Sequence, residues 1–295
     1  MNLSGRRESS NVDDRRGMST AAKVGGGGII GIIIAVVMAY FTNGGDFFGA
    51  LQSSGALDAI TNKNVVTSDQ QQREFTEEEQ ELAVFASRVL ASTEDVWSDV
   101  FEKQLGKEYV PPKMVLYTGS VQTGCGAGNA SVGPFYCSAD QALYIDLSFF
   151  TSMKKSLGAD GDFAYAYVIA HEVGHHVQHL LGTLNSAHAQ MAKMNETQAN
   201  KISVRIELQA DFYAGVWGYH EGKNFGSLED GDLEEAINCA QVIGDNYLQE
   251  KARGYSQPES FTHGTSAQRM RWLKLGLSTG SMSRGDTFSI SESQL

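Results

Sequence analysis

Length, composition and charge set the first bounds on this chain. It has 295 residues, of which 41% are hydrophobic and 9% aromatic, enough for a folded core, and this excludes a wholly disordered chain. The formal net charge of -12 argues against nucleic acid as a partner, because phosphate binding needs a basic surface. The charge is uneven, since residues 1–23 carry five basic and three acidic side chains, whereas the rest of the chain carries 18 basic and 32 acidic ones.

An uncharged apolar segment follows this basic N-terminus. Residues 24–45 carry no charge, and a helix that spans a bilayer needs about 20 such residues. A buried core helix and a cleaved signal peptide are the alternatives. A core helix rarely stays uncharged for this long, and the exit from Phe41 to Asp46 lacks an Ala-x-Ala-like cleavage site. The segment is therefore a predicted single-pass transmembrane helix, and because basic residues precede it, the positive-inside rule puts the N-terminus in the cytoplasm. Residues 1–23 are then a cytoplasmic basic tail, and the body of the protein lies outside the cytoplasm.

The three cysteines agree with an extracytoplasmic body. Cys125 and Cys137 lie 12 positions apart in a glycine-rich stretch, and an oxidising compartment would let them form a disulfide. The alternative, a zinc site, is weak because no second cysteine pair exists. Cys239 lies in a helical pattern and is expected to be a small core residue.

The folded domain is predicted to begin at residue 76, where Thr76 and Glu79 form a capping-box pattern. Residues 46–75 are the predicted linker before it, and residues 280–295, rich in Ser, are a predicted flexible tail after it. Between them, the periodicities predict an α+β domain at 76–279, mostly helical with a small sheet. The first predicted helix starts at residue 76, and the later ones cover about 93–105, 148–157, 162–181, 185–221 with a break near Asn195, 230–252 and 266–277. The predicted strands cover 114–117 and 142–146.

The helix predicted at 162–181 contains the sequence His171-Glu172-Val173-Gly174-His175. Two histidines four residues apart project from one face of a helix and are able to bind one zinc ion. Glu172 lies about 100° around the helix from His171, near the ion but off the ligand face. It is therefore the predicted general base that takes a proton from a zinc-activated water. An amphipathic helix with surface His and Glu is the alternative.

A catalytic zinc needs a third protein ligand and one open position. Glu207 and Asp211 lie four residues apart on a predicted helix that is otherwise apolar on that face, and a buried carboxylate pair needs a cation as partner. We expect Glu207 to be the third ligand and Asp211 to accept a hydrogen bond from a ligand histidine. The reverse assignment and a surface pair are the alternatives, and the remaining histidines are less suitable: His176, His179, His188 and His220.

His263 lies in a loop before the last predicted helix and is the candidate donor for the oxyanion of a tetrahedral intermediate. The alternative is an ordinary surface histidine. Arg269 follows on the same helix, where the pattern fits either an acidic partner or the substrate.

Three stretches together resemble the neutral zinc metallopeptidase family of bacterial membrane-anchored proteins. They are His171–Gln178, Glu207–Asp211 and Thr262–Thr265, and the N-terminal span and Gly133–Cys137 fit the same family. The resemblance covers the chain to about residue 277. It implies a zincin-like fold, Zn2+ on His171, His175 and Glu207, and Glu172 as base.

The resulting hypothesis is a zinc-dependent peptidase that hydrolyses peptide or protein substrates in the bacterial periplasm or at the cell exterior, held to the membrane by its N-terminal helix. A zinc-stabilised binding or quality-control module of the envelope with little catalysis is the first alternative. An amidase that acts on cell-wall peptides is the second.

Overall fold

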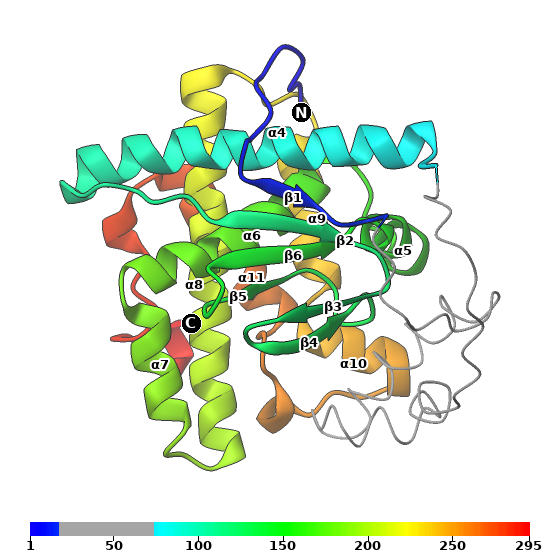
Figure 1. Cartoon of the computed structure of the whole chain (residues 1–295). Helices are drawn as coiled ribbons and strands as arrows, with labels where there is room; N and C mark the ends of the chain where they lie inside the picture. Colours follow the sequence, from blue (N-terminus) through cyan, green and yellow to red (C-terminus); the bar gives the residue numbers. More distant parts are fainter. Residues whose placement is uncertain (18–73) are drawn as a thin grey trace.

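The fold is built on a small mixed sheet. The computed structural model describes residues 1–17 and 74–295. Strands β1 (Val12–Asp14), β2 (Lys113–Tyr117), β6 (Ala142–Asp146) and β5 (Phe135–Cys137) lie in that order (Figure 1). The first three are parallel and β5 is antiparallel to β6, and β3 (Ser120–Thr123) and β4 (Gly126–Asn129) form a separate hairpin. The two predicted strands are confirmed as β2 and β6. Both are almost continuously buried in the structure.

Helices make up most of the described chain, so the α+β, mostly helical class is confirmed. They are α4 (Glu77–Val100), which continues as a π-helix at Phe101–Leu105, α5 (Ser148–Leu157), α6 (Asp162–Leu180), α7 (Thr183–Met191), α8 (Glu196–Phe225), α9 (Asp232–Val242), α10 (Asp245–Arg253) and α11 (Ser266–Thr279). Short 3-10 turns lie at Pro258–Ser260, Met282–Arg284 and Glu292–Gln294. In Figure 1, α4 runs along the β1 edge of the sheet, and α6 lies behind the strands.

Two helix boundaries differ from the prediction. The Thr76 capping box is present, but α4 runs without a break through the predicted second start at residue 93. Ser92 and Thr93 do not end the helix, because both are buried and their hydroxyls donate to Glu221 (2.6 Å) and to the Leu90 carbonyl (2.7 Å). The helix predicted at 230–252 is instead two helices, α9 and α10, which are separated at Gly244.

Helices α8 and α11 cross in close contact. A Cβ atom on Gly215 would lie 2.3 Å from the Leu273 carbonyl oxygen, and one on Gly276 would lie 2.2 Å from the Phe212 carbonyl oxygen. Only glycine allows this approach, because any side chain would force the two backbones apart. The crossing brings the first turns of α11 over the middle of α8, where the candidate site lies.

Residues 1–17 are part of the domain. Beside β1, the Met114 amide donates to the Asn11 carbonyl (2.9 Å) and the Arg15 amide donates to the Leu116 carbonyl (2.7 Å). Arg6 forms ion pairs with Glu221 at 3.1 Å and Asp95 at 3.2 Å. A tail separate from the domain is therefore a wrong prediction for these 17 residues, because β1 pairs with β2 and both Arg6 and Arg7 have carboxylate partners on the helices of the domain.

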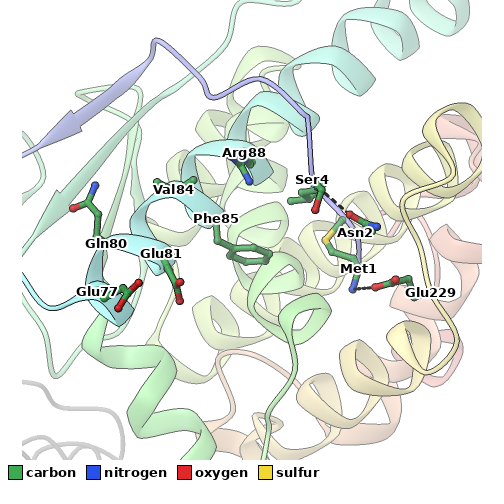
Figure 2. Close-up of a pocket in the computed structure, with 11 residues that line it drawn as sticks. Met1, Asn2, Ser4, Glu77, Gln80, Glu81, Val84, Phe85, Arg88 and Glu229 are labelled. Atoms are coloured by element: carbon green, nitrogen blue, oxygen red, sulfur yellow. Dashed lines mark hydrogen bonds and ion pairs between the residues drawn. The ribbon is translucent and has the colours of Figure 1, made fainter.

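The first residues also border a surface cavity of about 570 Å³ (Figure 2). Met1 and Ser4 form one wall, and the first turns of α4, including Phe85 and Arg88, form the other. Met1 is buried, so the N-terminal segment is anchored at its first residue as well as at β1.

The C-terminal residues 280–295 are packed against α8, and their prediction as a flexible tail is wrong. Arg205 donates to the Ile290 carbonyl (3.0 Å), and the fully buried Thr287 donates back to the Arg205 carbonyl (2.7 Å). Side chains of α8 therefore bind a segment whose serine-rich composition gave no helix or strand signal.

No helix within residues 1–17 and 74–295 is long and apolar enough to cross a membrane. The predicted span at 24–45 and the predicted linker up to residue 73 lie outside the described residues, so both stay predictions.

Candidate metal centre

Helices α6 and α8 bring three ligand-type side chains together. His171 and His175 lie one turn apart on α6, with ring centroids 4.8 Å apart. Glu207 of α8 faces both, with Oε2 at 3.1 Å from His171 Nε2 and Oε1 at 3.5 Å from His175 Nε2. These three residues form a group whose potential ligand atoms all lie within 4.8 Å of one another.

Gly174 sets the distance between the two helices. A Cβ atom at this position would lie 2.9 Å from the Ala210 carbonyl oxygen and 3.1 Å from the Ala210 Cα atom. The backbones of α6 and α8 thus touch between the two histidines and one turn from Glu207. A side chain at position 174 would move Glu207 away from the imidazoles.

The three residues fit zinc. In a tetrahedral zinc site with bonds of about 2.0–2.2 Å, neighbouring ligand atoms lie about 3.3–3.6 Å apart. The observed spacings of 3.1 and 3.5 Å are close to this edge length. The Nδ1 atoms of both rings have other partners, so both Nε2 atoms face the carboxylate. Two nitrogens and one carboxylate are the ligand set of a catalytic zinc with a fourth position open.

Asp211 orients His171 from behind. Its Oδ1 atom lies 2.8 Å from His171 Nδ1 and accepts a hydrogen bond from the Tyr167 hydroxyl (2.6 Å). Arg269 donates to both carboxylate oxygens, each at 2.8 Å, so its partner is acidic. Burial opposes ionisation of Asp211, but Arg269 and His171 hold its pKa at about 2. Asp211 therefore stays a carboxylate that accepts a hydrogen bond from His171 Nδ1.

In the absence of a metal, the same charges act on His171 and Glu207. Burial alone would lower the pKa of His171, but Asp211 and Glu207 raise it to about 10. Burial alone would raise the pKa of Glu207, but His175, His263 and His171 lower it well below its usual range. The centre is thus built to hold positive charge between two carboxylates.

Glu172 differs from the other acids of the site. It is 7% exposed, and its carboxylate has no hydrogen-bond partner within residues 1–17 and 74–295. Burial raises its pKa, and the positive charge of His175 and His171 only partly opposes the shift. A buried carboxylate without a partner and with a raised pKa is suited to accept a proton.

His263 is held by Asp245, at the start of α10. One Asp245 oxygen accepts the amide protons of Thr262 (2.8 Å), His263 (2.7 Å) and Gly264 (3.0 Å), and the other lies 3.3 Å from His263 Nδ1. A Cβ on Gly264 would touch Val204 and Leu208 of α8, on either side of Glu207 in the sequence. Burial lowers the pKa of His263, but the carboxylates of Glu207 and Asp245 raise it overall. The loop thus carries His263 to the rim of the centre, where its side chain is 40% exposed.

The other histidines do not join the group. His176 lies with Nε2 at 2.7 Å from the Val110 carbonyl oxygen and Nδ1 at 2.9 Å from the Tyr136 hydroxyl, so both of its nitrogens have partners. His220 contacts the Gly280 carbonyl oxygen at 2.8 Å, and His179 and His188 lie outside the group of ligand atoms. Cys125 and Cys137 form the expected disulfide, with Cα atoms 5.8 Å apart, and Cys239 is a buried free thiol.

Sequence reasoning missed several polar residues of the centre. Tyr167 lies one turn before His171, and Gln178 lies three residues after His175, so helical spacing could have pointed to both. Asp245 and Gln209 gave no such signal, because only the packing of α8, α10 and the C-terminal segment brings them to the site.

Comparison with known proteins places the chain in a family. The family described as "Putative neutral zinc metallopeptidase" matches residues 1–288. The chain belongs to this family. The uncharacterized protein YpfJ of Escherichia coli (strain K12) is 47% identical over 290 residues, which cover 98% of this chain and 99% of that protein. The uncharacterized protein Rv2575 of Mycobacterium tuberculosis (strain ATCC 25618 / H37Rv) is 41% identical over 215 residues, covering 70% and 71%.

No solved structure matches the chain significantly. The resemblance noted in the sequence is confirmed, and zinc is the metal that the description of the neutral zinc metallopeptidase family implies for the His171, His175 and Glu207 group.

Proposed function

We propose that the protein is a zinc-dependent peptidase that hydrolyses peptide bonds with Glu172 as general base. One observation carries this proposal: two Nε2 atoms and a carboxylate converge on one point, and a second carboxylate without a partner follows the first ligand on the same helix. A structural zinc site is closed by four protein ligands and binds no water that a base would deprotonate, so the second carboxylate favours a catalytic site.

The proposed roles follow from the geometry. Zinc on His171, His175 and Glu207 would lower the pKa of a water molecule toward neutrality and polarise the carbonyl of the scissile bond. Glu172 takes the proton of the attacking water and passes it to the leaving amine. Asp211 keeps the His171 proton on Nδ1, so that Nε2 offers its lone pair to the metal.

His263 is the proposed donor to the oxyanion of the tetrahedral intermediate. Asp245 holds the His263 backbone and faces its Nδ1 atom, which supports a ring that is protonated and oriented before the substrate binds.

We also propose that the centre works outside the cytoplasm. The Cys125–Cys137 disulfide supports this location, because disulfides persist in oxidising compartments and are rare in the cytosol. Comparison of the mass of alkylated protein from cells, with and without prior reduction, tests this location. Two freely alkylated thiols at Cys125 and Cys137 in unreduced protein would contradict it.

The decisive experiment compares the full-length protein with its Glu172→Gln variant. Zinc content is measured by atomic absorption, and cleavage is followed by mass spectrometry on a peptide library. We expect equal zinc and a loss of cleavage of about 10²–10⁴-fold in the variant. Glu196→Gln, on the first turn of α8, is the control and should cleave normally.

Two results would contradict the proposal. Full cleavage by the Glu172→Gln variant would remove the assigned base. Zinc binding by the unaltered protein without cleavage of any library peptide would instead favour a zinc-stabilised binding module.

A further inference from the structure

The two histidine ligands have different partners behind them. His171 Nδ1 faces the carboxylate of Asp211, whereas His175 Nδ1 lies 2.9 Å from Oε1 of Gln178. Gln178 is fully buried, three residues after His175 on α6. A neutral amide oxygen is therefore the only partner that the structure gives to His175 Nδ1 within the described residues.

The orientation of this amide is fixed from its other end. Gln178 Nε2 donates to the Ile206 carbonyl (2.7 Å) and to Oε1 of Gln209 (3.0 Å). Gln209, which is 6% exposed, in turn donates through Nε2 to the Gly285 carbonyl (2.8 Å). Backbone carbonyls only accept hydrogen bonds, so both glutamines must turn their NH2 groups toward them.

The donor and acceptor directions of all the hydrogen bonds in this series follow from the carbonyls of Ile206 and Gly285. With its NH2 group turned toward Ile206 and Gln209, Gln178 presents only an oxygen to His175. An oxygen is an acceptor, so the proton of His175 must lie on Nδ1. Nε2 then keeps its lone pair and points toward Glu207, where the proposed zinc would lie.

We propose that Gln178 and Gln209 are positioning residues that fix the tautomer and orientation of His175 through a hydrogen-bond relay anchored at Gly285. The relay extends the proposed function, because it has a purpose only if His175 binds a metal. It also gives a role to the C-terminal segment, which supplies the carbonyl at the outer end. Replacing either glutamine by a residue without an amide breaks the relay and frees the ring to rotate or to move its proton to Nε2.

The test measures zinc affinity and the tautomer of His175 in the full-length protein. Zinc affinity is measured by competition with a chelating dye, and the ring protons of the zinc-free protein are assigned by 1H–15N NMR. In the unaltered protein we expect the proton of neutral His175 on Nδ1. In Gln178→Leu and Gln209→Met we expect zinc to bind about 10–100-fold more weakly and part of the His175 proton to move to Nε2.

Gln209→Met is the key variant, because Gln209 does not touch His175. If the buried Gln178→Leu variant fails to fold, Gln209→Met still tests the relay. Gln198→Leu, on an exposed turn of α8, is the matched control and should change neither quantity.

The outcomes separate this proposal from the proposed function. If the unaltered protein binds no zinc, the proposed function fails. If it binds zinc and a folded Gln209→Met variant shows the same affinity and tautomer, only the relay is overturned.

Discussion

Arg269 holds Asp211 with two parallel hydrogen bonds, from Nε to Oδ2 and from Nη2 to Oδ1, each 2.8 Å long. The two residues lie 58 positions apart in the sequence, and the α8–α11 crossing brings them together. Because Asp211 also accepts from His171 and Tyr167, this single carboxylate joins three helices at the metal centre.

Replacing Arg269 by methionine should destabilise the fold by about 3–5 kcal/mol, because it leaves the buried Asp211 carboxylate without its cation. Arg269→Lys should recover only part of this loss, since an ammonium cannot form the bidentate pair. Urea unfolding measures both. Lys274→Met, on the exposed side of α11, is the control, and an unchanged midpoint in Arg269→Met would contradict the assignment.

His263→Asn should reduce turnover by about 10²–10³-fold while zinc content stays unchanged, because the side chain is expected to act on the transition state and not on the metal. Asp245→Asn should have a smaller effect in the same direction, since the amide oxygen still accepts from part of the loop. Steady-state kinetics on a library-derived peptide, with zinc analysis, checks both. Loss of zinc in His263→Asn would assign it a ligand role instead.

Cys239 should be inert in the native protein. It is fully buried, and burial raises the pKa of its thiol to about 12. The unfolded chain ionises this thiol above about pH 8.5, so this group's contribution to stability is present below that pH and is lost as the pH rises toward 12. A colorimetric thiol reagent should label no thiol in the native protein at neutral pH and one in denaturant without reductant. Rapid labelling of the native protein would contradict this burial.

A fragment that begins at residue 75 should be less stable than the full chain, because it exposes the edge of β2 and leaves the buried Glu221 without Arg6. We expect a lower midpoint of thermal unfolding and partial aggregation. A synthetic peptide of residues 1–17 should restore stability, whereas the same peptide with Arg15→Pro should not, because proline cannot donate to the Leu116 carbonyl. Equal stability of the fragment and the full chain would show that β1 contributes nothing.

The residues that lie close in sequence were the most predictable part of the site. His171, Glu172 and His175 follow from helical spacing alone, and Glu207 and Asp211 follow from the same spacing on a second helix. The long helices and the two buried strands were predictable for the same reason, since each has a strong local periodicity.

The missed features depend on contacts between distant segments. Strand β1 has three residues, two of them acidic, and is a strand only because β2 lies beside it. The C-terminal segment has no periodicity and is ordered by Arg205 and Gln209. Asp245 acquires its role only because the fold brings the His263 loop to the start of α10, and Gln209 acquires its role only through Gln178 of α6 and the Gly285 carbonyl, so no spacing rule predicts these two roles.

The pairing of β1 with β2 has a consequence for how the protein meets a membrane. Two hydrogen-bonded strands share one compartment, so residues 12–14 and the metal ligands lie on the same side of any bilayer. The predicted topology, with residues 1–23 in the cytoplasm and the body outside it, does not fit this pairing. The N-terminal arginines are on that side as well, where Arg6 and Arg7 are neutralised by carboxylates of the domain and are not free to mark the cytoplasmic side. The side of the membrane on which the domain lies is therefore better judged from its disulfide than from its N-terminal charge.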